Sequence, residues 1–401
     1  MLYREMGKTG DKVSILGYGC MRFPKKNRKI DEEMAERQIV SAIEQGVNYF
    51  DTAYIYPNSE EVLGRILAKR YRDKVMIASK LPSFMVHSYH EMENILDTEL
   101  KRLQTDHIDY YLMHSLMSME SWQRLKKLGV EDFLDKAKET GKIKHIGFSF
   151  HGNKFEFKQI VDDYPWEFSQ IQYNYMDENN QAGREGLEYA ASKGLGVSIM
   201  EPLRGGLLAR KNPSVEAVFN KSGKKWTPVE WALRFVWNHP GVSVVLSGMN
   251  SDTQVEENIR IANNAELDSL SSFELTCIDE AKKVFAERIK VGCTGCGYCM
   301  PCPAGVNIPL CFSNYNDRYI YDDKSIKFVY MGVLAGVDGT KPSYASLCKN
   351  CGKCERHCPQ HIQIRNNLKN VSKEMESFYF KLFVSVIHGY NLFRRLLKSN
   401  K

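Results

Sequence analysis

Eight of the eleven cysteines fall into two short runs near the end of the chain. The first run is C-T-G-C-G-Y-C-M-P-C-P at 293–303, and the second is C-K-N-C-G-K-C-E-R-H-C-P at 348–359. Three cysteines at every third position let one loop supply three thiolates to an iron-sulfur cubane, and a fourth followed by proline ligates the neighbouring cluster. The two runs therefore predict two [4Fe-4S] clusters.

The crossed pattern assigns the cysteines to two sets. One cluster is predicted on Cys293, Cys296, Cys299 and Cys358, and the other on Cys348, Cys351, Cys354 and Cys302. The second run has the bacterial ferredoxin spacing in full, whereas in the first run only Met300 and Pro301 separate the last two cysteines, where three residues are usual. Zinc is one alternative, although structural zinc takes two separated thiolate pairs around a tetrahedron. A disulfide framework is the other alternative.

Four further side chains have a joint chemistry. Asp51, Lys80 and His114 end three successive apolar runs, and Tyr56 lies in the segment that follows Asp51. Each alone has a plain structural explanation as a solvated lysine, a packing tyrosine or a core histidine. Together they suit carbonyl reduction, because a lysine cation held by a carboxylate lowers a tyrosine pKa from about 10 toward the working range. A histidine can meanwhile polarise the carbonyl oxygen.

The elements that must position these residues alternate regularly from residue 13 to about 260. Eight short apolar runs are separated by stretches long enough for helices: V-S-I-L-G-Y-G-C-M, N-Y-F-D-T-A, V-M-I-A-S-K, I-D-Y-Y-L-M-H, K-H-I-G-F-S-F, F-S-Q-I-Q-Y-N-Y, G-V-S-I-M-E-P-L and V-S-V-V-L-S-G. Eight strand-helix repeats predict an α/β fold, the closed (β/α)8 TIM barrel, with chemistry at the carboxyl ends of the strands. An open doubly wound sheet is the alternative, but no G-x-G-x-x-G follows the first strand.

Composition limits the functional classes. The net charge is +6 with 26% charged residues, and no basic block with aromatics suggests a nucleic-acid groove. Residues 1–13 hold no apolar leader, so we expect a cytoplasmic protein. The segment 371–401 predicts a basic amphipathic tail, for which docking on protein is favoured over a membrane surface.

The residues quoted above, with further motifs, resemble the aldo-keto reductase family. The motifs are G-Y-G-C-M-R, N-Y-F-D-T-A-Y-I-Y-P-N-S-E-E-V-L-G, I-A-S-K-L, I-D-Y-Y-L-M-H-S, Q-I-Q-Y-N, E-P-L-R-G-G-L-L and V-E-E-N. The resemblance implies a catalytic tetrad of Tyr56, Asp51, Lys80 and His114. The whole chain resembles the subgroup with a C-terminal dicluster ferredoxin-like domain, so we expect a barrel at 1–285, a small, mainly helical 4Fe-4S domain at 286–370 and the tail at 371–401.

The resemblance also implies NADP or NAD as cofactor. Ser149 and Gln170 match two contacts to the nicotinamide carboxamide, Phe150 replaces an asparagine that supplies the third, and Met200 takes the place of a stacking aromatic. Other implied contacts are Gly206, Ser247, Gly248, Asn250, Gln254, Glu257 and Asn258. The segment after the eighth strand has no basic residue before Arg260, which favours NADH unless Arg204 or Arg210 binds the 2′-phosphate. Alternatively, the segment after the eighth strand has no role in cofactor binding and is only a helix N-terminus capped by Ser251 or Asp252.

Two function classes follow from these features. The first is an enzyme that transfers hydride between NAD(P)H and a carbonyl or alcohol substrate, with clusters that exchange electrons with a redox partner protein. The second is an electron-transfer or partner-binding protein whose barrel is a non-catalytic scaffold. The intact tetrad favours the enzyme.

Overall fold

The computed structural model describes all residues except 28, 322, 337–340, 381, 383 and 385–401. The chain forms two compact units. The first unit comprises Met1–Ala209 and Lys225–Leu275, and the second comprises Arg210–Lys224 and Thr276–Lys401. The predicted boundary at 285 lies within helix α11, Ser272–Arg288. Most of the tail predicted at 371–401 lies outside the described residues.

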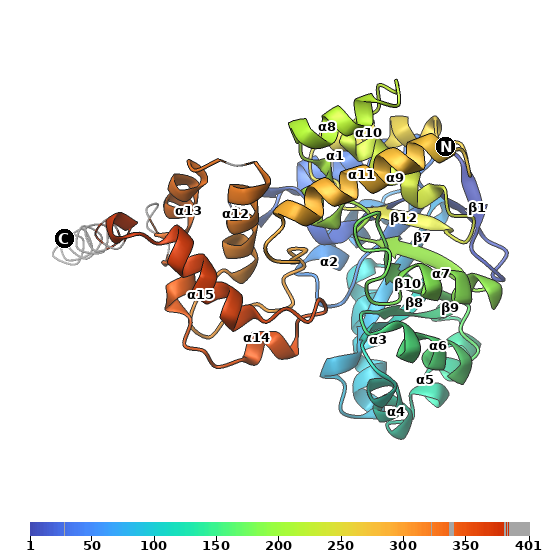
Figure 1. The fold of residues 1–401 in the computed structure, drawn as a ribbon. Coiled ribbons are helices and arrows are strands. Elements are labelled where there is room, and N and C mark those ends of the chain that lie inside the picture. The colour runs from blue at the N-terminus through green and yellow to red at the C-terminus, as the bar shows by residue number, and fades with distance from the viewer. Residues whose placement is uncertain (28, 322, 337–340, 381, 383, 385–401) are drawn as a thin grey trace. The chain divides into compact units, whose positions relative to one another are not determined.

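Eight parallel strands close into a barrel in the first unit (Figure 1). Each strand overlaps one of the eight predicted runs, so the predicted barrel is confirmed, although β7, β8 and β9 extend one or two residues beyond their runs. The strands pair in chain order, and β12 closes the barrel against β3. They are β3 (Leu16–Gly19), β6 (Tyr49–Asp51), β7 (Met76–Pro82), β8 (Ile108–Leu116), β9 (Ile143–Phe150), β10 (Phe168–Gln172), β11 (Gly196–Met200) and β12 (Val244–Ser247).

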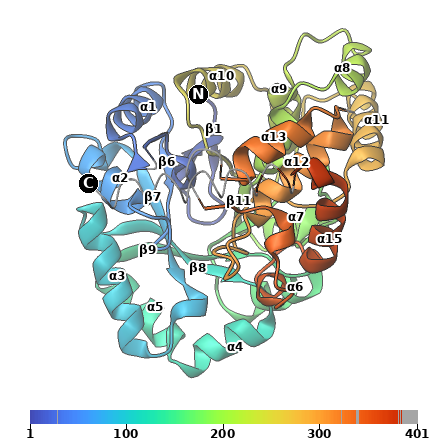
Figure 2. The ribbon, with the colours of Figure 1, turned by 90° about the vertical axis from the view of Figure 1, so that its left-hand side faces the viewer.

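Helices follow the strands and surround the barrel. Figure 2 shows α1, α3, α5 and α6 outside the strands. Most helix starts of this unit have a polar side-chain cap, and Ser251 caps α10 by accepting a hydrogen bond from the Gln254 backbone N–H. The helices of this unit are α1 (Glu32–Glu44), α2 (Ser59–Leu67), α3 (Tyr89–Leu103), α4 (Met119–Lys127), α5 (Val130–Glu139), α6 (Lys154–Asp163), α7 (Gly183–Ser192), α9 (Pro228–Trp237) and α10 (Asp252–Asn263).

An antiparallel hairpin precedes the barrel. Strands β1 (Tyr3–Glu5) and β2 (Lys12–Ser14) pair with each other, so the first predicted run divides between β2 and β3. Met6 and Val13 are fully buried in a cluster with Tyr49, Phe168 and Val244, which begin β6, β10 and β12. The hairpin therefore packs at the starts of the strands, at the end of the barrel opposite to the predicted chemistry. The alternating pattern of the run did not reveal this division.

The second unit is mainly helical, as predicted. Its helices are α8 (Pro213–Asn220), α12 (Ile308–Ile320), α13 (Ile326–Leu334), α14 (Lys353–Arg356) and α15 (Ile364–Met375). A buried core joins α12, α13 and α15 through side chains that include Phe312, Leu334 and Leu368. The buried Tyr330 hydroxyl donates a hydrogen bond to Glu376 (2.8 Å) and accepts one from the Ala345 backbone (2.9 Å). Within the described part of the chain, no helix has the length and apolar character needed to cross a membrane.

Candidate functional site

The ion pair between Lys80 and Asp51 lies at the carboxyl ends of β6 and β7. Asp51 is the last residue of β6, and its neighbour across the pairing is Ala78 of β7. Strand pairing thus places the Lys80 side chain close to the end of β6. The Lys80 Nζ atom lies 2.6 Å from Asp51 Oδ2 and 2.6 Å from the Thr52 carbonyl oxygen. Both charged side chains are buried, which fixes the ammonium group in place.

Tyr56 and His114 complete the predicted tetrad. Lys80 Nζ lies 5.5 Å from the centroid of the Tyr56 ring. The Tyr56 and His114 rings are 5.9 Å apart between centroids and meet edge to face at 84°. His114 is buried in β8, whereas Tyr56 is half-buried in the segment between β6 and α2. The structure therefore brings all four predicted residues together at one rim of the barrel.

Burial and the Lys80 cation set the charges of this site. Burial raises the pKa of Asp51, and the Lys80 charge with hydrogen bonds from Lys80 and Gln170 opposes that rise. Burial also lowers the pKa of His114 well below its usual range, and the charges of Lys80 and His151 lower it further. His114 is therefore a neutral imidazole near pH 7. A neutral imidazole donates one N–H without adding a second cation beside Lys80.

Ser149 and Gln170 lie side by side on neighbouring strands. They are paired in the register of β9 and β10, and both side chains are buried. Ser149 Oγ accepts a hydrogen bond from the Ser115 backbone N–H at 2.7 Å. Gln170 donates to Asp51, but its Oε1 atom has no hydrogen-bond partner among the described residues. Leaving a buried acceptor unsatisfied costs about 1–3 kcal/mol, so this oxygen fits an amide N–H donor such as the carboxamide of a nicotinamide.

His151 is a polar residue of this region that the sequence reasoning missed. Phe150, which replaces the family's asparagine, packs on Phe157 of α6 with 5.2 Å between ring centroids. Phe150 is therefore part of the hydrophobic core. His151 follows it, is buried, and its Nδ1 lies 3.2 Å from Gln181 Oε1. Burial lowers the pKa of His151 to about 4. The position of His151, two residues after the predicted nicotinamide contact Ser149, was the signal in the sequence that could have identified it.

The predicted contacts at the other end of the cofactor lie around β12 and α10. Met200 ends β11 and is half-buried, and Gly206 has a φ of +95° in the short helical segment η4 (Arg204–Ala209). The remaining side chains are engaged locally. Asn258 donates to Ser247 Oγ (2.9 Å), Gln254 Oε1 accepts from the Asn250 backbone (2.9 Å), and Glu257 accepts from Thr227 (2.9 Å).

Arg22 is a cation at the end of β12 that the sequence reasoning also missed. A Cβ atom built on Gly248 would lie 3.2 Å from Arg22 side-chain carbons, and Arg22 is exposed. The two arginines considered from the sequence have carboxylate partners. Buried Arg204 lies 2.8 Å from Asp177, and Arg210 pairs with Asp317. Arg22 was missed because it follows the first barrel strand and meets the last one only through barrel closure.

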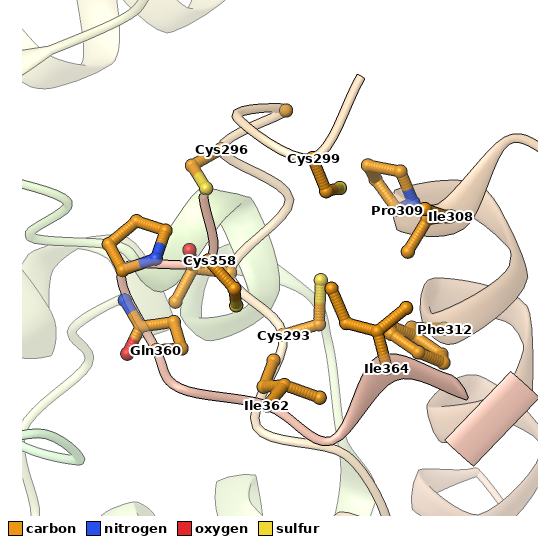
Figure 3. Close-up of a pocket in the computed structure, with 13 residues that line it drawn as sticks. Cys293, Cys296, Cys299, Ile308, Pro309, Phe312, Cys358, Gln360, Ile362 and Ile364 are labelled. Carbon is orange, nitrogen blue, oxygen red and sulfur yellow. The ribbon is translucent and has the colours of Figure 1, made fainter. Parts of the chain in front are cut away.

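Four of the predicted cluster cysteines line one cavity in the second unit. Cys293, Cys296 and Cys299 come from the segment before α12, and Cys358 comes from the turn before α15. Figure 3 shows their side chains around a common space, with Ile308, Phe312, Ile362 and Ile364 as apolar walls. Burial raises the pKa of Cys299 to about 12, and the charges of the three other cysteines contribute. The crossed set of the first cluster is thus brought together.

Three cysteines of the second crossed set, Cys302, Cys348 and Cys354, are also grouped. Burial raises the pKa of Cys354, and the charges of Glu355, Cys348 and Cys302 act in the same direction. Cys302 therefore lies near cysteines of the other run. Cys351 is exposed, and the Asn350 backbone N–H donates to Cys348 Sγ at 3.4 Å. Among the described residues, no three His, Cys, Asp or Glu side chains converge as ligands of a single metal ion would.

The barrel with its four-residue rim and the cysteine-lined cavity define an oxidoreductase that combines a TIM barrel with an iron-sulfur domain. The Aldo/keto reductase family model matches residues 15–280, and the 4Fe-4S dicluster domain model matches residues 292–363. The chain belongs to the aldo/keto reductase family and has a C-terminal 4Fe-4S dicluster domain.

Named relatives support this assignment. The chain is 29% identical over 294 residues to the L-galactose dehydrogenase of Arabidopsis thaliana, which covers 67% of this chain and 89% of the relative. It is 28% identical to the (1S)-1,7-diacetoxy-luvungin A aldo-keto reductase of Citrus sinensis, covering 64% and 83% of the two chains. The holo structure of a Bacillus halodurans aldo-keto reductase is similar with a TM-score of 0.59 and 25% identity, over 70% of this chain and 96% of that one.

Proposed function

We propose that this protein reduces a small carbonyl compound, or oxidises the corresponding alcohol, with NAD(P)H as hydride donor and with two [4Fe-4S] clusters that exchange electrons. The observation that supports this proposal most is the arrangement of Lys80. The ammonium lies 2.6 Å from Asp51 and 5.5 Å from the Tyr56 ring centroid, with His114 beside the same ring. A scaffold without catalysis has no need to bury a lysine beside a half-buried tyrosine.

Each residue of the tetrad has one task in this proposal. A nicotinamide, when bound, supplies or accepts the hydride. Tyr56 holds the proton that is given to the carbonyl oxygen, and the Lys80 cation stabilises the negative charge that then remains on the tyrosine oxygen. Neutral His114 donates a hydrogen bond to the same carbonyl oxygen and so stabilises the charge that develops there. Asp51 keeps the Lys80 ammonium oriented.

The residues around the rim can hold the nicotinamide. Ser149 and Gln170 are in register, and the unsatisfied Gln170 oxygen suits the carboxamide N–H group. His151, which follows Phe150 in the chain, is a third polar group near this position. The start of α10 offers backbone N–H groups to phosphates, and Arg22 provides a cation at the end of β12 for a 2′-phosphate.

The arrangement of the cysteines suits iron-sulfur clusters better than zinc. In the first set, four thiols surround a cavity, three from one run and one from the other. In the second set, Cys302 of the first run lies near Cys348 and Cys354 of the second run. A structural zinc ion would need four ligands about 2.3 Å from one centre. Two clusters together hold two electrons, which is the number carried by one hydride.

Replacing Tyr56 with phenylalanine tests the catalytic part of the proposal. Carbonyl reduction should fall by about two to four orders of magnitude, because the proton donor is lost while the ring remains. Tyr54→Phe is the matched control, since Tyr54 lies two residues away and stacks on Arg102 instead. NADPH binding, followed by cofactor fluorescence, should be the same in both variants. Full activity in Tyr56→Phe would show that Tyr56 is not the proton donor.

A further inference from the structure

A groove of about 350 Å³ lies beside the second set of cysteines. Cys348 and Asn350 line one side, and helix α15 lines the other side with Arg365, Lys369 and Lys373. These three cations recur every fourth residue, so they form one stripe along the helix. The stripe extends about 12 Å, given a rise of about 1.5 Å per residue. The groove therefore joins a cluster ligand to a row of positive charge.

The cations around this groove outnumber the available carboxylates. Exposed Lys369 and Lys373 form no ion pair among the described residues, and the same is true of Lys349, Lys353 and Arg356, which flank Cys351. The neighbouring carboxylates are already engaged. Arg365 pairs with Glu355 at 2.7 Å and Lys327 pairs with Glu374 at 3.1 Å, while Glu376 is buried and bonded to Tyr330. The surface thus has a local excess of positive charge that nothing in the described chain neutralises.

The second cluster is the one that this surface can serve. Cys351, which is predicted to ligate it, is exposed, and Cys348 lines the groove. Electron tunnelling weakens steeply with distance, so a partner must approach the exposed edge of a cluster closely. Cations arranged around that edge attract a negatively charged partner and orient it during encounter. The five cations that form no ion pair among the described residues come from two segments, 349–356 and α15, which together offer more charge than one small anion needs.

We propose that the groove and the cations around Cys351 form the docking surface of an acidic one-electron carrier protein. This inference rests on the proposed clusters and adds the place and charge of their partner. In each encounter the reduced carrier loses one electron and the second cluster gains it, changing from the 2+ to the 1+ state. No bond is made or broken and no proton is transferred. The reverse transfer uses the same surface with the oxidised carrier.

Stopped-flow reduction of the full holoprotein tests the docking surface. The probe is reduced flavodoxin, an acidic one-electron carrier, and the cluster absorbance is followed anaerobically. Lys369→Gln/Lys373→Gln removes two charges from the groove. Lys283→Gln/Lys324→Gln is the matched control, because it removes two exposed lysines of the same unit that do not line the groove. Iron and sulfide analysis shows whether each variant retains its clusters. A second check is the spectrum after photoreduction, in which EDTA supplies the electrons and deazariboflavin, a small neutral photosensitiser, passes them on.

The groove variant should react about tenfold more slowly than the wild type at low ionic strength, and the control should react like the wild type. The difference should vanish near 0.5 M salt, where charges are screened within about 4 Å. Equal rates and equal salt dependence in both variants, with intact clusters, would overturn the proposed docking surface. The proposal that the protein holds two clusters would be unaffected. Saturable inhibition by phosphate at constant ionic strength would show that the groove binds a small anion, and it would also overturn the proposed docking surface. Absence of clusters in the wild type would instead defeat the proposed function.

Discussion

Replacing Lys80 with methionine should leave the Asp51 carboxylate buried without its cation. Lys80 is 1% exposed and Asp51 is 5% exposed, and their charged atoms are 2.6 Å apart. Removing one partner of a buried ion pair costs about 3–5 kcal/mol, and the Thr52 carbonyl also loses its donor. We therefore expect Lys80→Met to lower the free energy of unfolding of the barrel by about 3–5 kcal/mol near pH 8.

The pH dependence of this loss has a definite sign. Without Lys80, burial should raise the pKa of Asp51 in the folded state further above its unfolded value of about 3.9. The folded variant then binds a proton that the unfolded chain releases, so its stability is lost as pH rises through the folded pKa. The penalty of Lys80→Met should therefore be smaller at pH 5 than at pH 8.

Tryptophan fluorescence during urea unfolding measures this penalty in the full chain. All five tryptophans, at positions 122, 166, 226, 231 and 237, belong to the first unit, so their emission reports on the barrel alone. Lys142→Met is the control. Lys142 also lies 2.6 Å from a carboxylate, that of Asp97, but both side chains are exposed, and such pairs contribute about 0–1 kcal/mol.

A double variant, Asp51→Asn with Lys80→Met, isolates the ion pair. Because neither charge remains, its penalty should be smaller than the sum of the single penalties by about 2–3 kcal/mol. Carbonyl reduction should stay low in the double variant, since the Lys80 cation is still absent. Additive penalties would refute the view that the two charges stabilise each other in the buried site.

Three further predictions concern other residues. Arg22→Gln should raise the KM for NADPH by about 10- to 100-fold, because a charge-assisted phosphate contact is lost, with little change for NADH; an equal change for both nucleotides would exclude a 2′-phosphate contact. His151→Gln should weaken the acid sensitivity of the barrel. The folded pKa of about 4 lies below the unfolded value of 6.5, so the wild type should lose about 2 kcal/mol more than the variant between pH 7 and pH 5, measured by urea unfolding. Cys358→Ala should alter the paramagnetic resonance spectrum of the cluster built on Cys293, Cys296 and Cys299, and a spectrum like that of Cys351→Ala would exclude crossed ligation.

Local sequence patterns determined much of this protein. Consecutive spacing of cysteines reflects how one loop wraps a cluster, so it is readable without knowing the fold. The alternation of apolar runs and helix-length stretches likewise predicted the barrel, because each strand must bury both faces between the barrel interior and a helix. Asp51, Lys80 and His114 could be chosen because strand ends share one rim in this architecture. The hairpin of β1 and β2 escaped prediction, since β2 and β3 are consecutive parts of one apolar run.

Only the tertiary structure decided which distant side chains meet. Barrel closure brings Arg22 to Gly248, strand register places Ser149 beside Gln170, and Gln170 reaches Asp51. Burial gave His151 its lowered pKa and took Phe150 into the core. Such contacts depend on pairing between segments far apart in the chain and on the solvent that packing removes. Composition and spacing specify the chemical groups, whereas the folded barrel fixes their distances and their charges.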